Sequence, residues 1–159
     1  AEILRRQAHS RAQHPLLVCD GDRISYGEAD ERSAELARGL IAYGAGKRTH
    51  VGLLYPNGTD FVVGMPAAAR SVAAVIPFST FATARELREQ LVDSDTEILL
   101  ATRSFRSHDY AQRLAEVIGR AGLDSDARLF ASAVPQLRRV VVDSCRVCSA
   151  ARTVPPALL

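Results

Sequence analysis

The sequence predicts an α/β domain with a mostly parallel sheet, helices on the faces of that sheet and a small N-terminal β-hairpin. Short apolar runs at 51–55, 73–78 and 97–101 alternate with longer segments of helical periodicity. Strands that alternate with helices of this length indicate βαβ units, whose strands run parallel. The helical segments after Ser25 and Thr83 each begin with a capping box, which fixes where these helices start.

The first residues predict a helix and then a hairpin. Ala1–Gln13 has the composition of a helix, and Pro15 ends it. Leu16–Cys19 and Arg23–Ile24 then form two short strands about Asp20-Gly21-Asp22. Asp-Gly readily supplies the positive φ angles that a tight hairpin turn requires.

The next helix is the most strongly specified element. Ser25 and Glu28 form the capping box, in which each side chain accepts a hydrogen bond from the other's backbone N–H. Gly44 stands where a helix commonly ends. Six residues fall on one helical face and predict its buried side: Ala29, Ser33, Leu36, Ala37, Leu40 and Ile41.

Val51–Tyr55 predicts a strand buried on both faces, because it is apolar throughout and Pro56-Asn57-Gly58 stops it. Thr59–Arg70 predicts a helix with Pro66 inside it, where Pro removes one backbone hydrogen bond. Ala73–Phe78 predicts the next strand.

The remaining elements continue the alternation. Thr83 and Glu86 form the second capping box, before a helix that runs to about Asp93. A strand is expected at Glu97–Ala101, a helix at Ser107–Gly119 and a last strand at Arg139–Val142.

Composition limits the class of protein. The chain has 159 residues, enough for one domain, with 47% hydrophobic and 24% charged residues, which speaks against disorder. Its net charge of +2 comes from dispersed arginines, which argues against nucleic-acid binding. No apolar run reaches the roughly 18 residues of a membrane span. A cytoplasmic location is expected, and the sparse set of three cysteines fits a reducing compartment.

Three segments together resemble the start of the adenylate-forming ligases, the acyl-CoA synthetases and their relatives. Ser25-Tyr26-Gly27-Glu28 resembles the family's opening motif, and Leu54-Tyr55-Pro56-Asn57 resembles its apolar-Pro-Asn-Ser turn, with Gly58 where Ser is common. Ala69–Pro77 resembles the signature Leu-Lys-Ala-Gly-Ala followed by a strand and Pro, from which Arg70 and Ser71 depart.

The resemblance implies that residues 1–143 are the N-terminal segment of the ligase large domain and that residues 144–159 are an irregular tail without resemblance. The parent enzyme would use ATP, Mg²⁺ and CoA. It would activate a carboxylic acid, such as a fatty acid, as its acyl-AMP and pass the acyl group to the CoA thiol. The remainder of the ligase would be the natural partner of this chain.

Ser79, Thr80 and Phe81 are the candidate substrate-binding residues. They follow the carboxyl end of a predicted parallel strand, where ligands collect in open α/β sheets. Relatives often have Asn/Thr-x-Arg here, whereas this chain has Phe81. A plain turn that leads to the next capped helix is the alternative explanation of these residues.

No residue of this chain is expected to be catalytic, and no cofactor is expected to bind to it alone. Gly44-Ala45-Gly46 runs from a helix to a strand, whereas phosphate-binding loops run from a strand to a helix. Lys47, the only lysine, lies in the turn that follows. The family's Gly-rich loop ending in Pro-Lys-Gly is not found, so the chain alone should lack ligase activity.

No metal site is expected either. Cys145-x-x-Cys148 is half of a zinc-binding pattern without a second half. His9 and His14 are expected on an exposed helix face and its exit, His50 before a strand, and His108 in a first helical turn in contact with solvent.

Two alternatives remain open. The chain could be a stand-alone α/β ligand-binding module, and strand edges left uncovered would then favour a homodimer. A weaker alternative is an unrelated nucleotide-binding fold, which would need a phosphate site that the sequence does not show.

Overall fold

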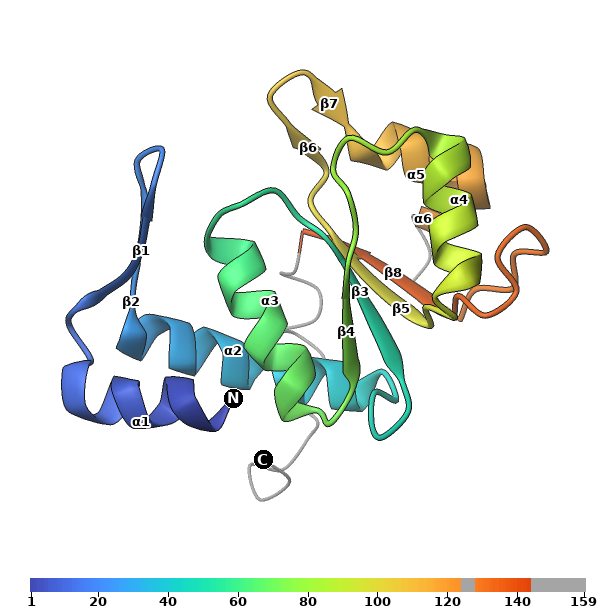
Figure 1. Cartoon of the computed structure of the whole chain (residues 1–159). Coiled ribbons are helices and arrows are strands. Elements are labelled where there is room, and N and C mark those ends of the chain that lie inside the picture. The colour runs from blue at the N-terminus through green and yellow to red at the C-terminus, as the bar shows by residue number, and fades with distance from the viewer. Residues whose placement is uncertain (124–127, 144–159) are drawn as a thin grey trace.

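The computed structural model describes residues 1–123 and 128–143 (Figure 1). The helices are α1 (Glu2–Arg11), α2 (Tyr26–Ala42), α3 (Thr59–Arg70), α4 (Ala84–Asp93), α5 (Tyr110–Ile118) and α6 (Arg120–Leu123). The strands are β1 (Pro15–Cys19), β2 (Asp22–Ser25), β3 (His50–Leu54), β4 (Ala74–Pro77), β5 (Ile98–Ala101), β6 (Ser104–Phe105), β7 (His108–Asp109) and β8 (Arg139–Val142).

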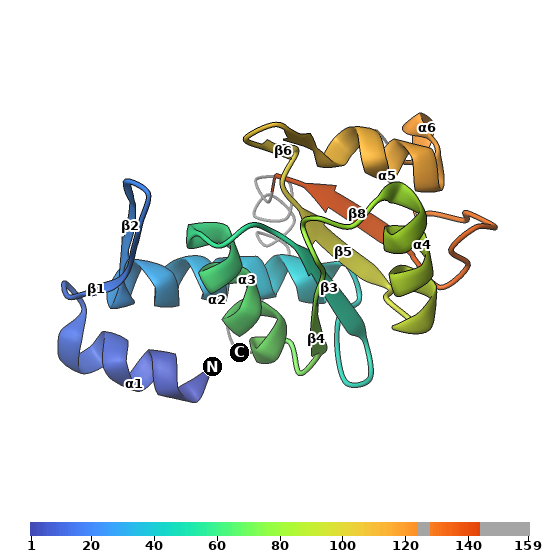
Figure 2. The same ribbon diagram turned by 45° about the horizontal axis from the view of Figure 1, so that its top comes forward.

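The central sheet has four parallel strands in the order β4-β3-β5-β8, and β1 pairs with β2 in an antiparallel hairpin. Helices α2 and α3 lie on one side of the sheet, and α4 and α5 lie on the other (Figures 1 and 2). The predicted α/β class, with flanking helices and an N-terminal hairpin, is therefore confirmed.

The alternation of side chains along the strands divides the core in two. Val51 and Leu53 of β3 join the core beneath α2 and α3, whereas Leu54 joins the core beneath α4 and α5. On β5, Leu100 faces the first core and Leu99 the second, and both are fully buried. Both central strands are thus buried on both faces, as continuously apolar parallel strands require.

Gly52 of β3 lies where the second core is most crowded. A Cβ at this position would come within 2.5 Å of the Phe78 ring and 2.9 Å of a Leu99 methyl. The missing side chain of Gly52 is therefore a packing requirement of the sheet.

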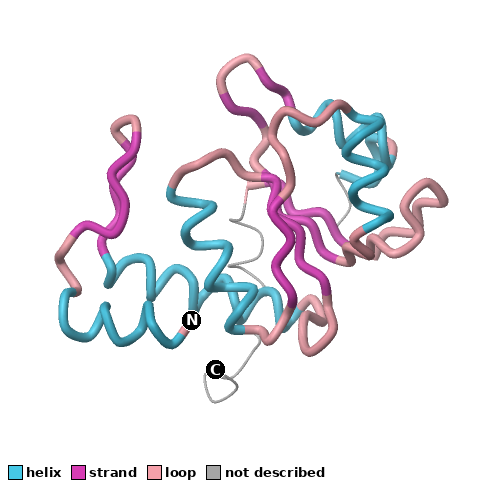
Figure 3. Tube along the Cα trace, in the orientation of Figure 1, coloured by secondary structure: helices cyan, strands magenta, loops and turns pink. Residues whose placement is uncertain are grey.

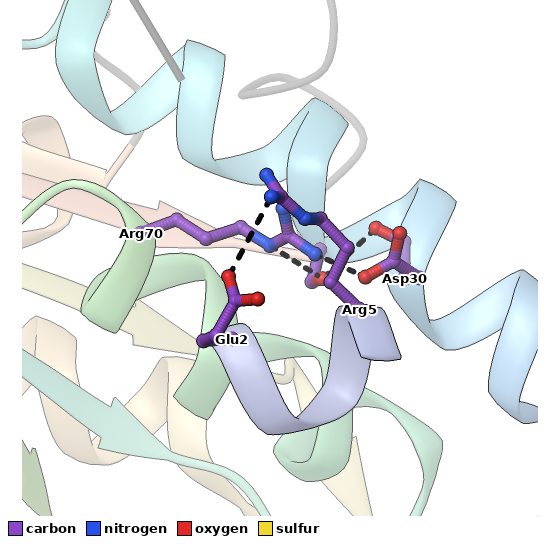
Figure 4. Close-up of polar contacts among 5 residues, drawn as sticks. Glu2, Arg5, Asp30 and Arg70 are labelled. Carbon is purple, nitrogen blue, oxygen red and sulfur yellow. Dashed lines mark hydrogen bonds and ion pairs between the residues drawn. The ribbon is translucent and has the colours of Figure 1, made fainter. Parts of the chain in front are cut away.

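Helices α2 and α3 are joined by a partly buried polar contact, which Figure 4 shows beside the Glu2–Arg5 pair of α1. The Arg70 guanidinium forms an ion pair with Asp30 and donates through Nε to the Ser33 hydroxyl at 3.2 Å. Only 10% of the Arg70 side chain is exposed, so the contact lies largely out of water. Arg70 thus fixes α3 against α2.

The hairpin supplies a cap for α3. Gly58 at the helix N-terminus has no side chain, and the Thr59 N–H donates to Asp22 Oδ2 of the hairpin at 2.8 Å. The Thr59 side chain and then the Thr59 backbone N–H lower the pKa of the Asp22 carboxyl. Asp20 and Gly21, both with positive φ, form the turn that brings Asp22 into place.

The ends of the predicted helices are mostly confirmed. Both capping boxes form, and the Ala45 N–H donates to the Leu40 carbonyl just after the left-handed Gly44. At the end of α3 the left-handed residue is Val72, with φ of 60°. A β-branched residue is unfavourable in this region, so this bend carries backbone strain.

The sequence predicted a helix at Ser107–Gly119, but the observed helix begins three residues later, at Tyr110. Residues 104–109 form a small hairpin of β6 and β7, and α5 begins at Tyr110 because the Asp109 carboxylate accepts from the Gln112 N–H. His108 therefore lies in β7 and not in a helical turn, which corrects the sequence prediction. His50 is the first residue of β3 and lies 2.6 Å through Nδ1 from the Ser94 carbonyl oxygen.

We predict that Gly52→Ala lowers the free energy of unfolding by about 1–3 kcal/mol, the usual cost of overpacking a core. Urea denaturation measures this change. Gly46→Ala is the matched control, because a Cβ at Gly46 would meet no atom within 4 Å. Equal losses in the two variants would show that the crowding around Gly52 is not the cause.

We predict that Asp22→Ala costs about 1 kcal/mol at neutral pH, the typical value of a lost helix cap. Since folding lowers the pKa of Asp22, its stabilisation is present above the unfolded-state value of about 3.9 and is lost as pH falls through the folded-state pKa. The deficit of Asp22→Ala should therefore shrink in urea denaturation at acidic pH.

The control for this cap is Asp20→Asn, which removes an exposed ion pair with Arg106 from the same hairpin. Such pairs contribute about 0–1 kcal/mol. A deficit of Asp22→Ala that stays constant from neutral to acidic pH would contradict the role of the carboxylate.

Candidate functional site

The carboxyl ends of the parallel strands meet at one edge of the sheet. Figure 3 shows the loops that leave this edge toward α3, α4 and the β6–β7 hairpin. Ligands of open α/β sheets bind at such an edge, outside the point where successive connections leave in opposite directions. In this sheet β4 lies on one side of β3 and β5 on the other, so that point lies between β3 and β5.

Ser79, Thr80 and Phe81, the residues predicted to bind substrate, lie in the loop after β4 at this edge. Ser79 and Phe81 are exposed, and 80% of the surface of Phe81 is open. The Ser79 hydroxyl accepts a hydrogen bond from the Phe81 N–H at 3.3 Å. Phe78 and Ala82, on either side, are buried in the second core. The loop is thus anchored at both ends, with an aromatic ring projecting between them.

Arg113 of α5 holds this loop in place. Its Nη1 donates to the carbonyl oxygens of Thr80 and Ala82, each at 3.0 Å. Its guanidinium also lies 5.4 Å from the centroid of the Tyr110 ring, in reach of a cation–π interaction. The two carbonyl groups flank Phe81, so one side chain fixes the backbone on both sides of it.

His108 completes the cluster and places its imidazole ring against the loop. Nη2 of Arg113 lies 2.7 Å from His108 Nδ1. Because a guanidinium only donates, Nδ1 is the acceptor in this contact. The imidazole meets Phe81 edge to face at 5.9 Å and stacks on Tyr110 at 6.2 Å. His108 was expected in contact with solvent, whereas it is half-buried and contacts Arg113, Phe81 and Tyr110.

A second feature of this edge is a hollow of about 370 Å³ between the N-terminal hairpin and the start of α3. Its lining comes from residues that follow β3 and β5, including Thr59, Thr102 and Phe105, and from the hairpin. Its position matches the point between β3 and β5 where the connections diverge.

The charges of the hollow already have partners. Arg32 Nη2 lies 3.3 Å from Asp60 Oδ1, Asp20 pairs with Arg106, and Asp22 caps α3. Burial raises the pKa of Asp60, and the charges of Asp22 and Asp143 act in the same direction against Arg32. Each charged side chain that lines the hollow is therefore already engaged within the fold.

The glycines after α2 do not fit a nucleotide phosphate. The Gly44 and Ala45 N–H groups donate to the Ile41 and Leu40 carbonyls, and the Gly46 N–H donates to the Thr49 hydroxyl at 3.2 Å. These donors close the end of a helix, and an anion would have to displace them. Lys47 is exposed in the same turn.

Within residues 1–123 and 128–143, no cluster of three or more His, Cys, Asp or Glu side chains is placed to hold a metal ion. Cys145 and Cys148 lie outside the described residues. Among the helices described, none combines the length and apolarity that a bilayer crossing requires.

Sequence reasoning missed Arg113 and His108 as parts of this edge. Arg113 lies 31 residues from Ala82, whose carbonyl it binds, and no local pattern marks that distance. The predicted order of elements could have indicated that they lie close together. Parallel strands bring the residues after β4 and the residues after β5 to the same edge of the sheet.

Comparisons with known proteins place this fold in a family. A family model described as "AMP-binding enzyme" matches residues 4–147. The novobiocin biosynthesis protein H of Streptomyces niveus is 33% identical over 104 residues, which are 65% of this chain and 17% of that protein. Surfactin synthase subunit 1 of Bacillus subtilis is 26% identical over 106 residues, 67% of this chain and 3% of that protein.

Solved structures agree with this assignment. The anthranilate CoA ligase AuaEII, in complex with anthranoyl-AMP, superposes on 98% of this chain with a TM-score of 0.76 and 16% identity. This chain spans only 27% of that ligase. The shared fold and the extent of the family match lead to one conclusion: the chain belongs to the AMP-binding enzymes of the adenylate-forming superfamily and corresponds to their N-terminal region.

Proposed function

We propose that this chain is the N-terminal part of an ATP-dependent acyl-CoA synthetase. The parent enzyme activates a carboxylic acid as its acyl-AMP, with ATP and Mg²⁺, and then transfers the acyl group to the thiol of CoA. The observation that carries the proposal is the fold, which follows that of a CoA ligase over 98% of this chain. Fatty acids are the substrate class proposed for the parent, which acts in the cytoplasm.

In this proposal the chain supplies framework and part of an acyl or pantetheine channel. The loop of Ser79, Thr80 and Phe81 supports this role, because it is fixed at the carboxyl edge and exposes an apolar ring. ATP and Mg²⁺ are bound by the remainder of the ligase, since the glycines after α2 use their N–H groups to end the helix.

We predict that the purified 159-residue chain releases no pyrophosphate from ATP when fatty or aromatic acids are added. The physical reason is that it lacks both the phosphate-binding loop and an activating lysine at the sheet edge. A coupled pyrophosphate assay with a panel of acids measures this. Acid-dependent turnover by this chain alone would contradict the proposal.

The acceptor is tested with the protein encoded by the complete reading frame. A CoA synthetase consumes one free thiol of CoA for each AMP formed, and a thiol-reactive dye follows that consumption. Transfer to a carrier-protein thiol, with CoA left unchanged, would instead favour the peptide synthetase branch, to which surfactin synthase belongs.

A stand-alone ligand-binding module that dimerises is the second candidate. Strand β4 lies at one end of the strand order and pairs with β3 alone among the described strands, so it presents an edge there. Calorimetry with ATP, acyl-AMP and CoA, beside light scattering for the mass in solution, separates the two candidates. Binding of acyl-AMP by a stable dimer would favour the module.

A further inference from the structure

We propose that Arg113 is a positioning residue that presents Phe81 at the carboxyl edge as an apolar contact for the acyl group. The inference rests on the proposed function, because it assigns the loop after β4 to the acyl site. It adds a residue from α5 to a site that sequence reasoning placed only on the loop.

The geometry around Phe81 is the first argument. Phe81 is 80% exposed, although burial of a phenyl ring is worth about 1.5–3 kcal/mol. Its backbone is nevertheless fixed, because one guanidinium binds the carbonyl oxygens of Thr80 and Ala82 on either side of it. The hydrogen bonds of Thr80 and Ala82 with Arg113 thus keep the Phe81 ring exposed to water, as expected of a side chain that contacts an apolar ligand.

The contacts of the ring and of the guanidinium beside it are the second argument. His108 meets Phe81 edge to face, and its Nδ1 accepts a hydrogen bond from Arg113. Tyr110 stacks beneath it and also covers the guanidinium. The charge of Arg113 is directed at carbonyls and rings, and the surface beside Phe81 suits the hydrocarbon part of an acid.

Arg113 is suited to this task because its donors diverge from one rigid plane. It serves two carbonyl oxygens and one ring nitrogen at the same time. A lysine ammonium at the end of a flexible chain cannot hold three such acceptors in one fixed plane. Loss of the Arg113 guanidinium should therefore release the loop after β4 without unfolding the two cores.

The test uses a single tryptophan, since the chain has none of its own. Phe81→Trp places the reporter in the loop, and Phe130→Trp is the matched control, because Phe130 is 84% exposed outside the cluster. Each reporter is combined with Arg113→Met, which keeps an apolar stem and removes the donors. Time-resolved fluorescence anisotropy then measures the nanosecond motion of each indole.

We expect Arg113→Met to raise the amplitude of fast motion of the indole at position 81 about twofold and to leave position 130 unchanged. Arg113→Lys should give a smaller rise, and it replaces Arg113→Met if that variant does not fold. Unchanged motion at position 81, or an equal rise at both positions, would overturn the positioning role.

The acyl contact is tested separately by adding decanoate to the Phe81→Trp chain. We expect its emission to shift to shorter wavelength, and Arg113→Met to weaken the decanoate affinity at least tenfold. A reporter that is loosened by Arg113→Met but does not respond to decanoate would overturn the acyl contact while the positioning of Phe81 stands. Pyrophosphate release is not used in this test, so its result is independent of the proposed ligase activity.

Discussion

Strands β3 and β5 have no face toward water, and this constraint organises the molecule. Their side chains alternate between two cores, so each face of the sheet needs its own cover of helices. The helical connections that cover the two faces bring the chain back to the same end of the sheet, so that all strands run in the same direction. All carboxyl ends therefore meet at one edge, and the loop after β4, the start of α3 and the β6–β7 hairpin become neighbours there. The core on one face of the sheet is packed so closely that it leaves no room for a Cβ at Gly52.

Polar contacts between distant segments then decide the details of that edge. Asp22 of the hairpin caps α3, Arg70 ties α3 to Asp30 of α2, and Arg113 ties the loop after β4 to α5. Each contact satisfies backbone or charged groups that packing alone would leave without partners. These contacts fasten the loops of the edge to the helices and the hairpin around them, and a scaffold of this kind can position binding residues on loops.

The hydrogen bonds of the glycine-rich turn after α2 have a physical basis in this framework. The glycine-rich turn after α2 lies where the amino ends of the strands begin, and its N–H groups are used to end the helix. Members of the family that this chain matches are several times longer, since 17% of one relative and 27% of one solved ligase are covered. We propose that the division of labour is spatial, with this segment forming one wall of the site and the nucleotide held by residues beyond it.

The sequence by itself determined the elements whose signals are local. The capping boxes at Ser25 and Thr83, the Asp20-Gly21 turn and the apolar runs of β3 and β5 depend on neighbours within a few residues, and each was found in place. It also placed Ser79, Thr80 and Phe81 in a loop at the end of a strand. Only the structure showed that His108 lies in a hairpin and that Arg113 holds the loop around Phe81. These outcomes depend on contacts across 31 or more residues or on competition between a turn and a helix, and such contacts leave no periodic trace in the chain.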